Sequence, residues 1–284
     1  MAESARLSNS QVDRAGSTVR DYLTDSERRP ELDDFRAAIG VIEAFRAQHR
    51  LPLQTARRGL GSCVVSEGYE AESAIEITQR LKRRDTIADK LRREPRMKLS
   101  RMQDVGGCRV VLPSLEAIAR VGRRFTANSE RRNGEADRVL DYVTNPRPSG
   151  YRAIHIHTRY GGRRIEVQLR TPWQHLWARL VEDLTSRTGV DYKNGAGPPG
   201  HHSGLQSLGD LYAARDIEGP DRWVPDYELR ELAEEIIELI TPESVPRAGG
   251  SSGENGAQVC PLPCAYGNHS TPEPDDPLLD RLQP

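Results

Sequence analysis

Apolar residues recur with helical spacing in several stretches of the chain. After Pro30 the repeat runs through Phe35, Ile39, Ile42 and Phe45, which predicts a helix starting near Pro30. The same spacing occurs in residues 71–93, in the segment that follows Pro172, and in residues 226–242. Each of these stretches has polar residues on its other side, as a helix packed against a core does.

Strict alternation marks two segments that flank a Gly161-Gly162 turn, residues 151–158 and 164–170. This period of two predicts a β-hairpin with one apolar face. Its opposite face would carry Tyr151, Ala153, His155 and His157 from the first strand and Glu166, Gln168 and Arg170 from the second. A further strand is predicted at Cys108–Leu112, shortly after Asp104. Strands and helices together predict an α+β fold with one folded domain.

The limits of that domain follow from composition. Residues 1–29 are rich in Ser, Arg and Asp without periodicity and are expected to be frayed or disordered. Residues 243–284 form a Pro/Gly-rich tail, for which no fold is expected. The folded domain is therefore placed at 30–242.

Composition and charge exclude several classes of protein. Among the 284 residues, 41 Lys and Arg balance 42 Asp and Glu, so the chain is not a globally basic nucleic-acid binder. Four cysteines are too few for a disulfide scaffold. The chain has neither an apolar run long enough to span a membrane nor a secretory signal at its N-terminus. A cytoplasmic protein without a membrane partner is expected.

The near-neutral total hides a local surplus of positive charge. Residues 78–103 contain ten Lys or Arg and only three acidic residues, and Asp104 follows directly. If Asp104 and Glu166 lie close together, their carboxylates could share Mg²⁺, because this hard cation prefers carboxylate and phosphate oxygens. Basic residues beside such a pair suit the phosphates of a nucleotide.

Four motifs follow one another between residues 70 and 193. They are Arg80-Leu-Lys82 with Thr86-Ile87-x-x-Lys90; Asp104-Val-Gly-Gly-Cys-Arg109-Val; Asp141-Tyr-Val-x-x-Pro146-x-x-x-Gly150-Tyr151-Arg-Ala-x-His155; and Glu166-Val-Gln168-x-Arg170-Thr171 with His175 and Trp177-Ala178 downstream. In this order they resemble the synthetase domain of the RelA/SpoT family, which makes the alarmones pppGpp and ppGpp. The resemblance implies a nucleotidyltransferase-like synthetase fold, in which a mixed β-sheet is flanked by helices.

The resemblance also implies roles for the donor side of the site. Arg80 and Arg109 would sandwich the adenine of ATP, and Lys82 and Lys90 would hold its phosphates. Asp104 and Glu166 would be the catalytic carboxylates and would ligate Mg²⁺, with Glu166 also activating the acceptor hydroxyl.

On the acceptor side, the resemblance implies that Tyr151 stacks on the base, that Gln168 and His175 lie near its edge, and that His155 lies near its phosphates. The implied enzyme is a GTP/GDP diphosphokinase. It transfers the β,γ-pyrophosphate of ATP to the ribose 3′-OH of GDP or GTP, as in the stringent response. Relatives often assemble through terminal helices, so a homo-oligomer is a further expectation.

The chain also departs from the family pattern. Leu140 stands where relatives carry Lys in Arg-x-Lys-Asp or an acidic version of this motif, so the sequence does not indicate whether GDP or GTP is preferred. Fewer than 80 residues precede the segment that resembles the synthetase domain. They lack the His-Asp pair with which the hydrolase half of bifunctional relatives binds its metal. We therefore expect a stand-alone small alarmone synthetase that does not hydrolyse its product.

Three alternatives remain at this point. Some small members of the family pyrophosphorylate the 3′-CCA end of tRNA, and others make adenosine alarmones. A third alternative is a catalytically silent nucleotide-binding regulator. The retention of Asp104, Glu166, Arg80 and Arg109 argues against the silent regulator.

Overall fold

The computed structural model describes residues 6–27, 29–69, 77–134 and 137–218, which all belong to one compact unit, Met1–Ile240. The helix expected at 226–242 and the tail expected at 243–284 lie outside the described residues. Within the described ranges, no helix combines the length and the apolar character needed to cross a bilayer.

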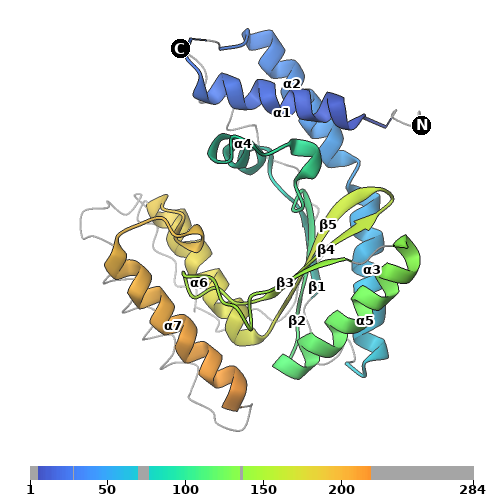
Figure 1. Ribbon diagram of the computed structural model, residues 1–284, viewed down its shortest axis with the longest axis vertical. Coiled ribbons are helices and arrows are strands. Elements are labelled where there is room, and N and C mark those ends of the chain that lie inside the picture. The colour runs from blue at the N-terminus through green and yellow to red at the C-terminus, as the bar shows by residue number, and fades with distance from the viewer. Residues whose placement is uncertain (1–5, 28, 70–76, 135–136, 219–284) are drawn as a thin grey trace, which may run out of the picture. The chain divides into compact units, whose positions relative to one another are not determined.

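A five-stranded mixed sheet forms the centre of the described fold (Figure 1). The strands are β1 (Ile77–Leu81), β2 (Gly106–Val111), β3 (Arg138–Asp141), β4 (Ile154–Tyr160) and β5 (Arg163–Arg170). Their order is β1-β2-β5-β4-β3, in which β2 and β5 run parallel and the other neighbours are antiparallel. The predicted hairpin is β4–β5, and it is confirmed together with the mixed sheet.

Two helices cover the apolar face of this sheet. Figure 1 shows α3 (Arg50–Ser66) and α5 (Leu115–Asn133) on the same side of the strands. Ser114 caps α5 by accepting a hydrogen bond from the backbone of Ala117. Between the helices and the strands lies a core that includes the alternate hairpin residues Ile156, Ile165, Val167 and Leu169. The predicted alternation of the hairpin is thereby confirmed, and its polar residues are left for the other face.

A second pair of helices, α6 (Pro172–Thr188) and α7 (Pro199–Glu218), packs on the other side of the sheet (Figure 1). The helix expected after Pro172 is therefore present, and Thr171 caps it in a reciprocal capping box with Gln174. The short 3₁₀ segment η2 (Tyr192–Asn194) joins the two helices. Trp177 and Tyr151 are buried in the small core beneath them.

The N-terminal part is a correction to the sequence analysis. Residues 1–29 were expected to be frayed, but Asn9–Thr24 form helix α1. Ser8 and Gln11 close a capping box at its start, and its buried side includes Val12 and Val19. This short apolar stripe packs on α2 (Leu32–Ala47), the helix expected after Pro30, and on α4 (Arg84–Arg93).

The segment expected to form one helix over residues 71–93 is also different. Residues 77–81 form strand β1, which pairs with β2, and only residues 84–93 are helical, as α4. Gln, Arg, Leu and Lys are good helix formers, but pairing with a strand distant in sequence outweighs this local preference. Asp85 lies in the first turn of α4 and Lys90 in its last, which suits the helix dipole. The 3₁₀ turn η1 (Leu99–Arg101) follows α4.

Candidate active site

The register of the sheet brings polar side chains side by side on the face opposite α3 and α5. Paired residues on neighbouring strands share a face, so one row consists of Arg80, Gly107, Glu166, His157 and Arg138. The adjacent row on this face consists of Thr78, Arg109, Gln168, His155 and Leu140. Sheet pairing alone therefore gathers arginine, histidine and carboxylate groups from all five strands.

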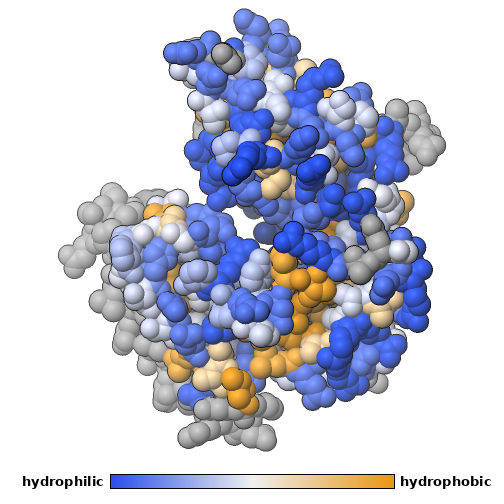
Figure 2. Space-filling view, in the orientation of Figure 1, coloured by the Kyte–Doolittle hydropathy of each residue, from blue (hydrophilic) through white to orange (hydrophobic). Residues whose placement is uncertain are grey.

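A cavity of about 810 Å³ lies over this polar face, between the strands, α4 and η2. Figure 2 shows the surface hollowed at its centre, with hydrophilic side chains on the α4 side of the opening and a hydrophobic band adjoining it below. The predicted site residues that line the cavity are Arg80, Lys82, Lys90, Asp104, Arg109, His155, Glu166 and Gln168. The other two, Tyr151 and His175, are not part of its lining.

Glu166 is held at the centre of the polar face by its neighbours. Its Oε1 lies 3.0 Å from Nδ1 of His155 and 3.5 Å from Nε2 of His157, and its Oε2 accepts a hydrogen bond of 2.7 Å from the Gln168 amide. Burial opposes ionisation of this carboxyl, but the hydrogen bonds from both histidines and Gln168 outweigh it and hold the pKa of Glu166 well below its ordinary value. Glu166 is thus a carboxylate with fixed orientation.

Asp104 receives one ammonium group on each of its oxygens. Lys82 Nζ lies 2.9 Å from Oδ2, and Lys90 Nζ lies 3.0 Å from Oδ1. Lys82 is brought there because its backbone N–H continues the β1 pairing and donates to the carbonyl of Val105. Burial would raise the pKa of Asp104, but the two lysines outweigh that effect and lower it. Two cations are therefore gathered at one carboxylate in the lining of the cavity.

The donor set fits a hard divalent cation. Asp104 and Glu166 line the same cavity, and Glu166 is near enough for its negative charge to act on Asp104 and raise the pKa of that carboxyl. Gly107 lies beside Glu166 in the polar row, and the nearest atom to a Cβ built there would be the Glu166 carbonyl oxygen at 3.6 Å. The missing side chain thus leaves the floor of the cavity open beside Glu166. Carboxylates combined with substrate phosphates are the usual ligands of Mg²⁺.

Histidine adds a second kind of ligand to this position. His155, His157 and Glu166 each present one ligand atom, and these atoms lie within 4.8 Å of one another. His155 Nε2 is engaged with the Tyr151 hydroxyl, whereas His157 Nδ1 finds no hydrogen-bond partner among the described residues. The sequence analysis placed His157 on the polar face but did not include it among the site residues.

Tyr151 is fully buried beside the cavity rather than exposed within it. Its hydroxyl lies 2.6 Å from Nε2 of His155 and accepts a hydrogen bond of 3.0 Å from Arg170. The Lys193 ammonium lies over its ring, 4.7 Å from the ring centre. An acceptor base could stack on Tyr151 only after Lys193 has moved.

His175 lies on α6, in the first turns after Thr171. Its Nδ1 is buried and finds no hydrogen-bond partner among the described residues. Burial, assisted by the positive charges of Arg109 and Arg170, lowers the pKa of His175 to about 4. A neutral imidazole near Arg109 is thus present, but the structure does not open it to the cavity.

Sequence reasoning missed several residues that line the cavity. Arg93 comes from α4, Arg147 from the loop before β4, and Lys193 and Asn194 from η2. Arg147 and Arg93 lie within or next to the quoted motifs, so their charge was a usable signal. The segment at 193–194 carries no motif, and only the fold brings it to the site.

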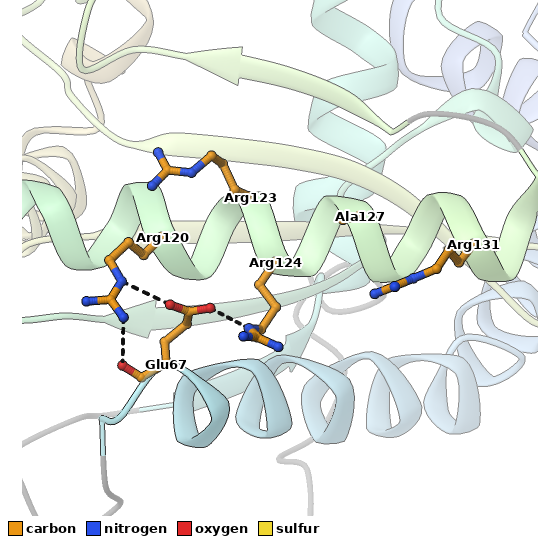
Figure 3. A pocket seen from close by; sticks show the side chains of 6 residues that line it. All are labelled: Glu67, Arg120, Arg123, Arg124, Ala127 and Arg131. Atoms are coloured by element: carbon orange, nitrogen blue, oxygen red, sulfur yellow. Dashed lines mark hydrogen bonds and ion pairs between the residues drawn. The ribbon is translucent and has the colours of Figure 1, made fainter.

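A second, shallower hollow lies on the outer helices, away from the polar face. Figure 3 shows Arg120 and Arg124 converging on Glu67, while Arg123 points away from it. Arg120 Nε lies 2.9 Å from the Glu67 carboxylate, and Arg124 donates to its other oxygen. These ion pairs join the end of α3 to α5, so we interpret this cluster as structural.

Comparison with known proteins identifies the part of the chain that carries the site. Residues 79–195 match the family model of a region found in RelA / SpoT proteins. An uncharacterized protein of Mycobacterium tuberculosis is 32% identical over 117 residues, which are 41% of this chain and 42% of that protein. GTP pyrophosphokinase of Escherichia coli strain K12 is 30% identical over 139 residues, which are 47% of this chain and 17% of that enzyme. The match thus spans less than half the length of these curated relatives.

The fold has a counterpart among solved structures. The crystal structure of small alarmone synthetase 1 from Bacillus subtilis, bound to its product pppGpp, superposes with a TM-score of 0.51 at 24% identity. The superposition covers 62% of this chain and 93% of that protein. The expected resemblance to the RelA/SpoT synthetase domain and the expected α+β synthetase fold are therefore confirmed.

Proposed function

We propose that this chain, whose residues 79–195 form a RelA/SpoT region, is a pyrophosphokinase that uses GDP or GTP as its acceptor. The β,γ-pyrophosphate of ATP would pass to the ribose 3′-OH, and AMP would leave. The observation that carries this proposal is the joining of Asp104 and Glu166 with lysine and arginine side chains in one cavity. The names of the Escherichia coli and Bacillus subtilis proteins support the guanosine acceptor.

The donor side follows from the charges at the β1–α4 end of the cavity. Lys82 and Lys90 bind the ATP phosphates. Their ion pairs with Asp104 hold both ammonium groups at this end of the cavity. Arg80 and Arg109 come from neighbouring strands and adjacent rows of the polar face, so their planar guanidinium groups are positioned to hold the adenine. Half of the basic residues in segment 78–103 line this cavity, so ATP phosphates account for much of the local positive charge.

The transfer step depends mainly on positioning and on charge neutralisation. The ionised Glu166 accepts a hydrogen bond from the acceptor 3′-hydroxyl and directs its oxygen at the β-phosphorus. The new bond forms between this oxygen and the β-phosphorus, and the hydroxyl proton passes to the Glu166 carboxylate. The bond between the β-phosphorus and the oxygen that bridges to the α-phosphate breaks, and this oxygen leaves with AMP. A divalent cation bound by Asp104 and Glu166 would supply charge neutralisation at the phosphate oxygens. His155 and Gln168 keep the Glu166 carboxylate in place.

A single reaction tests this proposal. Purified protein with Mg²⁺ and γ-labelled ATP is offered GDP, GTP and bulk tRNA together, and the products are separated by size and then by nucleotide. Label in a guanosine tetra- or pentaphosphate is expected. Label on tRNA, or on an adenosine nucleotide, would replace the guanosine acceptor by one of the alternatives. ATP binding without any transfer would indicate a nucleotide-binding regulator.

A further inference from the structure

The segment Asp191–Asn194 closes one side of the cavity and is anchored from two directions. Arg93 Nη1 of α4 lies 2.5 Å from the Asp191 carboxylate. From the loop before β4, the Ser149 hydroxyl donates to the Lys193 carbonyl at 3.1 Å, and Arg147 donates to the Asn194 side chain at 3.0 Å. This segment is thus tied both to the helix that carries Lys90 and to the loop that carries Tyr151.

From this anchored segment, the Lys193 side chain reaches into the cavity. Its ammonium lies 4.7 Å from the centre of the Tyr151 ring, and 3.8 Å from the Glu182 carboxylate. Only a quarter of the side chain is exposed. Burial, together with the nearby charge of Arg170, lowers the pKa of Lys193 to about 8. An ammonium that is mostly buried and has only a distant ionic partner is strongly stabilised when it binds an anionic ligand.

Among the described residues, strand β3 contributes no cation to the lining of this corner of the cavity, because Arg138 is not one of the lining residues. Its residue in the row of His155 and Gln168 is Leu140, which lines the cavity with an apolar side chain. The other cation on this side, Arg147, already donates to Asn194 and to the Tyr142 hydroxyl. At this end of the described cavity, Lys193 is therefore the cation best able to leave its partner Glu182 and bind an anionic ligand.

We propose that Lys193 is a specificity-determining residue that binds the 5′-phosphates of the acceptor nucleotide. This inference rests on the proposed function and names a residue that lies outside the four motifs quoted above, although within the matched region 79–195. As the ammonium moves to the phosphates, it leaves the Tyr151 ring and frees that face for the acceptor base. Lys193 thus links recognition of the phosphates to recognition of the base.

The test measures binding without turnover. Guanosine, GMP and GDP are titrated by calorimetry into the protein held with Mg²⁺ and a non-hydrolysable ATP analogue. Lys193→Met removes the charge but keeps an apolar stem over Tyr151. We expect it to weaken GDP binding about tenfold to a hundredfold, the range for losing a charge-assisted hydrogen bond, and to leave guanosine and the ATP analogue unchanged. Lys193→Arg should retain most of the GDP affinity.

Two further variants make the result specific. Lys98→Met removes an exposed lysine that does not line the cavity, and it should bind GDP as the wild type does. Leu140→Lys, combined with Lys193→Met, places an ammonium in the same corner from β3 and should recover part of the preference for GDP over guanosine.

The opposite outcomes are distinguishable. Unchanged GDP affinity in Lys193→Met would overturn the inference and leave the proposed function intact. Equal losses for GDP, guanosine and the ATP analogue would also overturn it, because they would indicate a general defect of the site. A wild-type protein that neither binds guanine nucleotides nor labels them would overturn the proposed function, and the inference with it.

Discussion

The Glu166 carboxylate lies 3.0 Å from Nδ1 of His155. The other ring nitrogen of His155 lies 2.6 Å from the Tyr151 hydroxyl, which in turn accepts from Arg170. This chain of contacts is satisfied when His155 carries its proton on Nδ1, so that it donates to Glu166 and accepts from Tyr151. Since Tyr151 is buried beneath α6 and α7, those helices indirectly set the orientation of the carboxylate.

Replacing Glu166 by Gln should abolish transfer while leaving ATP affinity nearly unchanged. The amide is neutral and cannot accept the 3′-hydroxyl hydrogen bond as a carboxylate does, whereas the cations that bind ATP phosphates remain. We expect a loss of about a hundredfold or more in kcat, measured with labelled ATP. Glu116→Gln on exposed α5 is the control and should be fully active. An active Glu166→Gln enzyme would remove Glu166 from the mechanism.

Tyr151→Phe tests the chain of contacts behind Glu166. The change leaves His155 Nε2 and part of the Arg170 guanidinium without a partner, which costs about 1–3 kcal/mol of folding free energy. The melting temperature should fall by about 2–10 °C. We also expect kcat to fall with little change in the KM for ATP, because Glu166 loses its orientation.

The matched control for that variant is Tyr212→Phe. Tyr212 lies on α7 and is also buried, but its hydroxyl has no hydrogen-bond partner among the described residues. Its removal should leave stability and activity unchanged or slightly improve stability. Equal effects of the two substitutions would show that the Tyr151 hydroxyl contributes nothing specific.

Part of this site could be predicted because the information is local. Alternation in the hairpin places His155, Glu166 and Gln168 on one face whatever the strands pair with. Lys82 was expected on a helix, because its neighbours favour helix and the pairing that makes them a strand comes from β2. Helix α1 was missed because its apolar stripe is short and is stabilised by packing on α2 and α4.

Other features depend on contacts that no local pattern contains. Lys193 lies in an irregular segment, and its position over Tyr151 is set by Arg93, Arg147 and Ser149 from other parts of the fold. The burial of Tyr151 likewise results from the packing of α6 and α7. The sequence therefore predicted which residues share the polar face better than it predicted the residues that close the cavity over that face.

Gly107→Val should block the floor of the cavity without unfolding the sheet. A Cβ at this position makes only ordinary contacts, and Val is favoured in strands. The additional methyl groups would project between Arg80 and Glu166, where the cation and phosphates are expected. We predict that ATP affinity falls about tenfold or more, and that the melting temperature stays near the wild-type value. Unchanged ATP affinity would place the nucleotide elsewhere.

Asp216 gives a pH-dependent prediction for stability. It lies on α7 and accepts hydrogen bonds from the Thr171 hydroxyl at 2.8 Å and the Gln174 amide at 3.1 Å, at the start of α6. Burial raises the pKa of Asp216 to about 6. The folded protein therefore holds this proton more tightly than the unfolded chain, so the stability it provides is full below about pH 4 and is lost as pH rises through about 6.

Asp216→Asn separates this effect from all other titrations. The Asn side chain still accepts both hydrogen bonds but carries no charge to bury. Its melting temperature minus that of the wild type should therefore be small below about pH 4, rise between about pH 4 and 6, and stay at its highest value above that range. Asp210→Asn, at an exposed residue of the same helix that pairs with Arg152, should lack this rise. A wild-type protein that is more stable than Asp216→Asn at pH 8 would show that the ionised carboxylate stabilises the contact between α6 and α7, opposite to the effect expected from its burial.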